Sequence, residues 1–248
     1  MEVHAHAHTA RKKWTHYFWE FLMLFLAVVC GFLAENQREH MIEHNREKQY
    51  MQSLLRDLYA DTAMIHAAIP RKEGRIKAVD SVFIFFKANP DANSISGKLF
   101  RTIRRTNFDA RFIRNNITVN QLKNAGGMRL IRKKQIADSI SSYDFLCAST
   151  ELYNELYVIN SQVGNRQFEK LFSASDLLSL YLENSGEAIV ANIPDMIVIR
   201  INTEALNEQL NFMMLEKAYA RQEINRYKEL ERRAISLMQL IKKAYHLE

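Results

Sequence analysis

One long, predominantly hydrophobic stretch lies near the start of the chain. It extends over 21 residues, from Trp14 to Ala34, and has no charged side chain from Phe21 onward. As a helix this run would rise about 31 Å, which matches the hydrocarbon thickness of a bilayer. Its first turns carry Trp14 and Trp19, and such aromatic residues favour the membrane interface. The pattern predicts a single transmembrane helix.

Beyond this run the hydrophobic residues return every three or four positions, which is the spacing of a helix with one buried face. From Met51 to Ile69 they alternate in steps of four and three, with Thr62 occupying one step. The spacing predicts that the transmembrane helix continues outward as a helical stalk to Ile69. Pro70 is then expected to interrupt it, because proline lacks the backbone N–H that a helix interior needs.

The same spacing recurs near the C-terminus, where it is typical of a coiled coil. Ten of its twelve positions are apolar or aromatic, the exceptions being Lys217 and Glu231. The positions are 206, 210, 213, 217, 220, 224, 227, 231, 234, 238, 241 and 245. This register places Ile224 in a packing seam and Glu223 outside it. We therefore expect Ile224→Asp to disrupt the fold or an oligomer, and Glu223→Lys to have little effect.

Composition favours an all-α fold. The chain of 248 residues has 3 prolines and 7 glycines, whereas these two residue types make up about 12% of average proteins. Between the stalk and the C-terminal helix, the spacing predicts shorter helices over 71–88, 92–105, 118–125, 133–171 and 175–184. Residues 189–201 are expected to form either a short strand or a buried loop. The predicted organisation is a tail over 1–13, a transmembrane helix over 14–34, a stalk over 35–69 and an extramembrane helical bundle over 70–248.

The charges beside the hydrophobic run indicate its orientation. Three consecutive basic residues, Arg11 to Lys13, precede it, whereas the basic residues that follow are interleaved with glutamates. Basic residues are retained on the cytoplasmic side, so we expect the N-terminus inside and the bulk of the chain outside. A cleaved signal peptide is disfavoured because Phe32 is too large for the position before a cleavage site at Ala34. An uncleaved signal anchor is therefore expected.

Positive charge is concentrated in the middle of the chain. The whole protein has a net charge of +6, and residues 98–134 hold eleven lysines and arginines against Asp109 alone. Such a field requires anions nearby, which could be acidic side chains of the last helices, anionic lipid, an envelope polymer or nucleic acid. The candidate residues for an anion or partner surface are Arg101, Arg104, Arg105, Arg111, Arg114, Arg129, Arg132, Lys133 and Lys134.

One short motif suggests metal chemistry. His40, Glu43 and His44 fit the H-x-x-E-H pattern of inverted zinc proteases, in which two histidines on one helix face bind zinc and the glutamate acts as base. A protease also needs a third ligand and a substrate cleft, and this motif lies on a charged stalk close to the membrane. We therefore expect no catalytic residues, no cofactor and no metal, with these three as weak metal candidates.

Two features of the hydrophobic run suggest contacts within the membrane. Glu20 is its only acidic residue and lies one helical turn from His16, with which it could pair. Ala27 and Gly31 have the small-xxx-small spacing that lets two helices approach closely. Together with the long 4-3 segments, this spacing predicts a homo-oligomer. The two cysteines, Cys30 and Cys147, do not suggest a disulfide framework.

Several motifs together resemble an uncharacterised bacterial family of single-pass membrane proteins. They are Lys13-Trp-Thr-His-Tyr-Phe-Trp-Glu-Phe, Phe25-Leu-Ala, Gly31-Phe, Glu35-Asn-Gln-Arg-Glu-His, Thr118-x-x-Gln-Leu-x-x-x-Gly-Gly-x-x-Leu-Ile and Ile140-x-x-Tyr. The likeness covers most of the chain. It implies a single-pass protein of the bacterial inner membrane and implies no particular activity. In the motif from Thr118, we expect a helix that begins at Thr118 and ends at Gly126 or Gly127, followed by core residues Leu130 and Ile131, with Tyr143 packing later.

These patterns favour a non-enzymatic, membrane-anchored envelope protein whose helical bundle faces the periplasm. Such a protein would act as a scaffold, adaptor or sensor, with the lipid bilayer, a second copy and another membrane protein as partners. Two alternatives remain open: a metal-dependent hydrolase using residues 40–44, and a cytoplasm-facing anchor that binds nucleic acid or anionic lipid through residues 98–134. The second alternative requires the opposite orientation.

Overall fold

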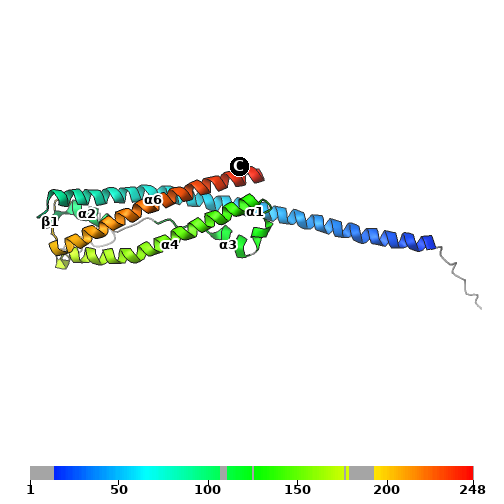
Figure 1. Ribbon diagram of the computed structural model, residues 1–248, viewed down its shortest axis with the longest axis horizontal. Helices are drawn as coiled ribbons and strands as arrows, with labels where there is room; N and C mark the ends of the chain where they lie inside the picture. Colours follow the sequence, from blue (N-terminus) through cyan, green and yellow to red (C-terminus); the bar gives the residue numbers. More distant parts are fainter. Residues whose placement is uncertain (1–13, 107–110, 125, 176, 179–192, 248) are drawn as a thin grey trace, which may run out of the picture. The chain divides into compact units, whose positions relative to one another are not determined.

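The computed structural model describes residues 14–106, 111–124, 126–175, 177–178 and 193–247, and most of them lie in helices (Figure 1). This confirms the expectation of an all-α protein with one long apolar N-terminal helix. The helices are α1 (Trp14–Ala88), α2 (Gly97–Thr106), α3 (Ile117–Asn124), α4 (Lys134–Leu171) and α6 (Thr203–Tyr245), with a 3-10 helix η1 (Gly127–Leu130) between α3 and α4. Two short strands, β1 (Ser94–Ser96) and β2 (Val198–Arg200), complete the described elements.

The chain divides into two compact units, residues 1–49 and 50–248. In the described part of the first unit, residues 14–49, the chain is one helix whose side chains are mostly exposed. Its apolar window is long and hydrophobic enough to cross a membrane, and none of that window is buried.

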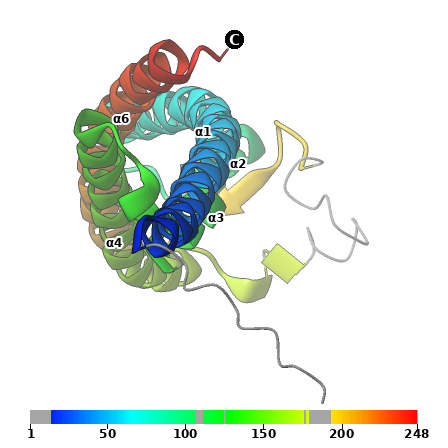
Figure 2. The same cartoon turned by 90° about the vertical axis from the view of Figure 1, so that its right-hand side faces the viewer.

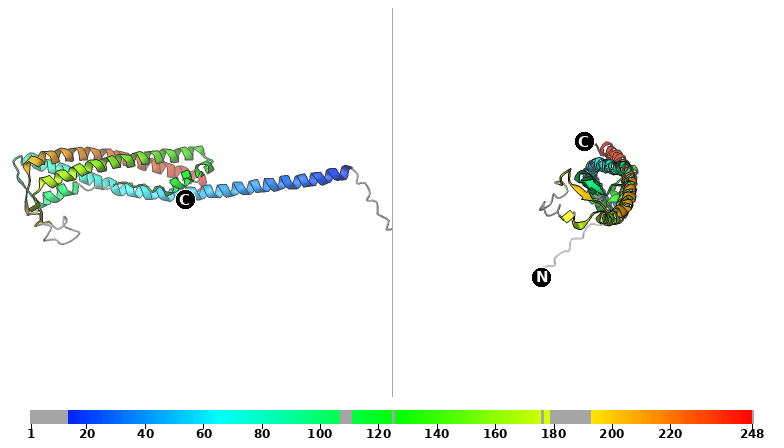
Figure 3. Two further views of the ribbon diagram at one scale, coloured as in Figure 1. Left: turned by 90° about the horizontal axis from the view of Figure 1, so that it is seen from below. Right: turned by 90° about the vertical axis from the view of Figure 1, so that its left-hand side faces the viewer.

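Three long helices form the second unit. The part of α1 from Tyr50 onward lies beside α4 and α6, and the three surround a common interior (Figures 2 and 3). Helix α6 runs antiparallel to the other two. Each helix presents an apolar face at three- and four-residue spacing, so burial of those faces against one another supplies the main stabilisation.

The hydrophobic core consists of two clusters, one toward each end of the bundle. The first joins the beginning of this part of α1 to α3, the start of α4 and the end of α6. Its members include Met51, Leu58, Ile65, Leu122, Ile140, Tyr227, Leu237 and Ile241. The second joins the end of α1 to α2, both strands and the start of α6. Its members include Val79, Val82, Phe100, Ile103, Leu171, Phe172, Ile199 and Met213.

A small antiparallel sheet belongs to this second cluster. Ile95 of β1 pairs with Ile199 of β2, and both side chains are buried. The strand over 198–200 confirms one of the two expectations for residues 189–201, of which 189–192 lie outside the described residues. Gly97 follows β1 where only glycine fits, because a Cβ there would lie 2.1 Å from the carbonyl oxygen of Pro194.

Helix α1 continues through Pro70, so the expected interruption at this residue is wrong. Proline within a helix costs about 3 kcal/mol. The helix nevertheless continues because buried residues lie on both sides of the proline, with Ile65 before it and Val79 and Val82 after it. The bundle also begins earlier than expected, since residues from Met51 onward belong to its core rather than to a free stalk.

The buried face of α6 differs from the predicted register in one respect. Eight of the twelve predicted positions are buried as expected, namely Met213, Ala220, Ile224, Tyr227, Ala234, Met238, Ile241 and Tyr245. Five further positions are buried, and each lies one residue before a predicted position and is more deeply buried than it. They are Gln209, Glu216, Glu223, Leu230 and Leu237. Ile224 is buried as expected. Glu223 is 0% exposed, so its expected place outside the seam is wrong. This burial removes the basis for expecting that Glu223→Lys has little effect.

The shorter elements follow the prediction in part. The expected helix over 92–105 is wrong at its start, because 94–96 form β1 and α2 begins at Gly97. Helix α4 matches the expected 133–171 to within one residue, and Gly126 ends the α3 region with φ of +65°, a conformation that glycine adopts without strain. Thr118 lies inside α3 rather than at its cap, and Asp57 accepts a 3.0 Å hydrogen bond from its backbone N–H. Ile131 and Tyr143 are buried as expected, whereas Leu130 is only partly buried. The expected helix over 175–184 lies mostly outside the described residues.

Candidate functional site

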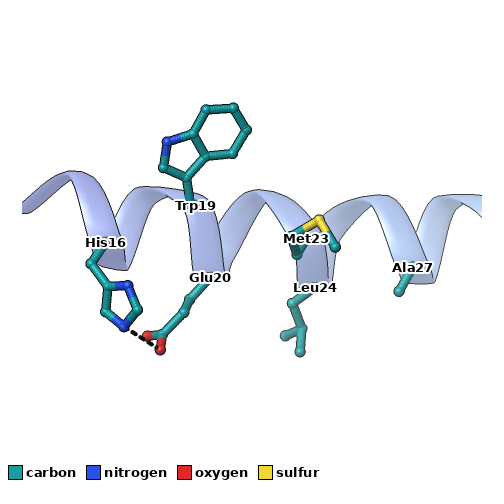
Figure 4. A pocket seen from close by; sticks show the side chains of 6 residues that line it. All are labelled: His16, Trp19, Glu20, Met23, Leu24 and Ala27. Carbon is teal, nitrogen blue, oxygen red and sulfur yellow. Dashed lines mark ion pairs between the residues drawn. The ribbon is translucent and has the colours of Figure 1, made fainter.

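The hydrophobic part of the first unit carries one ion pair. His16 Nε2 lies 3.0 Å from Glu20 Oε1, as their spacing predicts, and Figure 4 shows the two side chains pointing toward one another. Both are about half exposed. Among the described residues, no atom lies within 4 Å of the position that a Cβ would take on Gly31, so the face with Ala27 and Gly31 is open to a neighbour.

The two histidines of the H-x-x-E-H motif pair with different glutamates. His40 Nδ1 lies 3.7 Å from Glu43, and His44 Nδ1 lies 3.5 Å from Glu47. Each histidine therefore has its own carboxylate, and the two do not point toward one shared metal position. Within the described part of the chain, no group of three or more histidine, cysteine, aspartate or glutamate side chains is placed to hold a metal ion.

About half of the predicted basic surface makes internal contacts. Arg114 contacts Asp144 at 2.5 Å and Glu151 at 3.1 Å, and Lys123 also pairs with Asp144. Arg101 pairs with Asp195 across to the segment before β2.

Two more members of the basic surface lie over aromatic rings. Arg104 lies 5.5 Å from the ring centre of Phe168, and Lys133 lies 5.1 Å from that of Tyr245 while donating to a backbone carbonyl of α6. The remaining candidates have exposed side chains: Arg105, Arg111, Arg129, Arg132 and Lys134.

Four charged side chains meet in the interior of the bundle. We call Lys72 and Arg75 of α1 together with Glu216 and Glu223 of α6 the charged seam. Lys72 Nζ donates to Glu223 Oε2 at 2.7 Å, and both side chains are fully buried. The Lys72 ammonium also lies 5.3 Å from the ring centre of Tyr227.

The second pair of the charged seam is part of a larger network. Arg75 donates through Nη2 to Glu216 and through Nε to the backbone carbonyl of Thr106 at 2.6 Å. The Tyr157 hydroxyl of α4 donates to the same glutamate, and its ring lies 5.4 Å from the Arg75 guanidinium. The two cations and two carboxylates balance, which offsets the cost of removing them from water. The seam thus connects α1, α2, α4 and α6.

A buried carboxylate lies near the other end of the bundle. Asp61 accepts hydrogen bonds from the Asn115 backbone N–H and from the Tyr143 hydroxyl, both at 2.7 Å. Burial raises the pKa of Asp61 to about 6. Burial also raises the pKa of the neighbouring Cys147 thiol to about 12, so this cysteine stays protonated and is a poor nucleophile.

A cavity of about 450 Å³ adjoins the charged seam. We call it the arginine pocket. Its described lining residues are Pro70, Arg71, Gly74, Arg75 and Ala78 of α1 and Arg105 of α2. The five residues from α1 recur at positions that share one helix face. Arg75 belongs to both features, and among the described lining residues no side chain is acidic.

Most residues of the arginine pocket and of the charged seam were not predicted from the sequence. Of the predicted basic surface only Arg105 lines the pocket, and the charged seam lies outside residues 98–134. A usable signal was present in α6, where Gln209, Glu216 and Glu223 recur every seven residues in step with its buried apolar positions. Polar residues at such a heptad position can indicate a specific buried contact.

The chain matches no family model, no curated protein and no solved structure.

Proposed function

We propose that this is a non-enzymatic envelope protein, anchored in a bacterial inner membrane by the segment Trp14–Ala34. The observation that supports anchoring is the exposure of that segment. Large apolar side chains along it face outward, Leu24 and Phe32 being 72% exposed. Soluble proteins rarely expose a continuous apolar surface of this length, whereas hydrocarbon would remove it from water.

The bundle in the second unit would act as a scaffold, adaptor or sensor. Its interior ionisable groups pair with one another across different helices, and this arrangement suits fixing helix register more than performing a reaction. The basic residues before Trp14 favour a cytoplasmic N-terminus and a periplasmic bundle. The open face at Ala27 and Gly31 supports a second copy or another membrane helix as partner.

Alkaline carbonate extraction of membranes tests the anchoring. We expect the wild-type chain to stay in the membrane pellet. A double variant with Leu24→Arg and Leu26→Arg should move to the soluble fraction, because each central arginine costs about 3 kcal/mol on insertion.

The matched control carries the same chemical change elsewhere. Ile84→Arg with Ile113→Arg replaces two side chains of the second unit that are exposed, and this control should stay in the pellet. Release of the wild-type chain by carbonate would contradict membrane anchoring, and so would equal release of both double variants.

A further inference from the structure

We propose that the arginine pocket binds a small anion that carries phosphate groups. The proposal goes beyond membrane anchoring, since the pocket lies wholly within residues 70–105 of the second unit. It concerns a site that combines residues from two helices and was not recognisable in the sequence.

The charge of the lining favours an anion. Arg71 and Arg105 have exposed side chains and come from different helices, α1 and α2. A guanidinium presents a planar fork of donors that matches the oxygen atoms of a phosphate. The charge of Arg75 is balanced by Glu216. The other two arginines therefore give the pocket a positive potential.

The backbone next to Arg105 is held by a contact with α1. The Arg75 Nε donates to the carbonyl oxygen of Thr106, the residue after Arg105, and so connects the end of α2 to α1. Thr106 is itself buried. Two guanidinium groups held on a fixed frame lose less freedom on binding than two groups on separate mobile segments.

The shape of the wall also favours a ligand. Gly74 leaves the middle of the α1 wall without a side chain, and among the described residues no atom lies within 4 Å of the position of a Cβ there. Glycine within a helix costs about 1 kcal/mol relative to alanine. The volume of about 450 Å³ lies in the range of small-molecule pockets.

Titration calorimetry with inorganic pyrophosphate tests the proposal on the full chain in a neutral detergent. We expect saturable binding by the wild type. The double variant Arg71→Ala with Arg105→Ala should bind at least tenfold more weakly, since each lost charged hydrogen bond is worth about a tenfold change or more.

The control variant loses the same charge outside the pocket. Arg111→Ala with Lys134→Ala removes two exposed basic side chains of the predicted basic surface, and its affinity should stay within about twofold of wild type. Equal weakening in the two double variants would show general attraction to a basic protein and would overturn the proposal. Absence of pyrophosphate binding by the folded wild type would also overturn it.

Gly74→Leu separates binding from folding. The new side chain has open space, and leucine favours a helix more than glycine does, so the midpoint of thermal unfolding should not fall. Pyrophosphate affinity should nevertheless fall at least tenfold, because the leucine fills the pocket. Unchanged affinity in this variant would contradict the assignment of the site.

The phosphate groups could belong to a soluble compound or to a lipid headgroup. Repeating the titration in nanodiscs distinguishes these sources. If a headgroup is the ligand, pyrophosphate should bind more weakly in phosphatidylglycerol discs than in phosphatidylcholine discs, through competition. Equal affinity in the two discs assigns the pocket to a soluble anion. Binding in detergent does not require membrane insertion, so failure of this proposal and failure of the anchoring proposal remain distinguishable.

Discussion

At the scale of single residues, Asp61 shows how burial changes a titration. Its side chain is 1% exposed, and its two oxygens accept hydrogen bonds from Asn115 and Tyr143. Hydrogen bonds to a carboxylate lower its pKa, but loss of water raises it, and here burial has the larger effect. The folded protein therefore holds a proton on Asp61 at pH values where the unfolded chain releases it.

The stability contributed by Asp61 is fully present at pH values below its ordinary pKa near 3.8 and is lost as the pH rises through about 6. Asp61→Asn cannot ionise. From pH 4.5 to 7.5, the free energy of unfolding of this variant should therefore rise by about 2 kcal/mol relative to wild type. Urea unfolding followed by circular dichroism across this range measures the difference.

The control is Asp138→Asn, which changes an exposed aspartate of α4 in the same way. Its stability should follow the wild-type pH profile. A profile for Asp61→Asn that runs parallel to wild type would show that Asp61 keeps its ordinary pKa in the folded protein.

At the scale of single elements, α6 shows why the sequence predicted its helix but not its buried face. Helix length, helix type and eight of the buried positions follow from the apolar spacing. Burial of Gln209, Glu216 and Glu223 was not predicted, because these residues are polar and the four-three spacing placed the seam one residue later, at 210, 217 and 224. The hydrogen bond from Lys72 of α1 makes it favourable to bury Glu223.

Pro70 is a second case in which tertiary contacts override a local preference. Its missing N–H predicts the end of a helix, yet α1 continues for a further 18 residues to Ala88. The charged seam and the second core cluster both require this continuation, since Lys72, Arg75 and Val79 lie beyond the proline. The arginine pocket was not predicted for the same reason, because four of its residues on α1 lie after an expected break.

The charged seam predicts a specific pattern of stability changes. Glu223→Met leaves Lys72 buried without this carboxylate and should lower the free energy of unfolding by about 3–5 kcal/mol. Adding Lys72→Met removes the other charge as well, so the double variant should recover most of the loss. Urea unfolding of the wild type, of Glu223→Met, of Lys72→Met and of the double variant gives the coupling energy between the two side chains.

A surface pair between α4 and α6 is the control. Lys170 and Glu208 lie 3.8 Å apart with both side chains more than half exposed, so replacing either by methionine should change stability by less than about 1 kcal/mol. Similar losses for Glu223→Met and Glu208→Met would show that the assigned register of α6 is wrong.

At the scale of the whole molecule, α1 belongs to both units. Its first part is an exposed apolar helix, and its part from Met51 onward contributes core residues and two members of the charged seam. The exposed apolar segment was predictable because 21 consecutive residues carry the signal. The charged seam was not, because it depends on which helices pack together.

The most direct test of the account is the side of the membrane on which the bundle lies. Ser236 of α6 is exposed, so Ser236→Cys in a Cys30→Ala background provides one accessible thiol, the remaining Cys147 being buried. Labelling with an impermeant maleimide in spheroplasts of a bacterial host should modify this cysteine without lysis. Labelling only after lysis, with the chain still in the membrane pellet, would place the bundle in the cytoplasm and contradict the proposed envelope function.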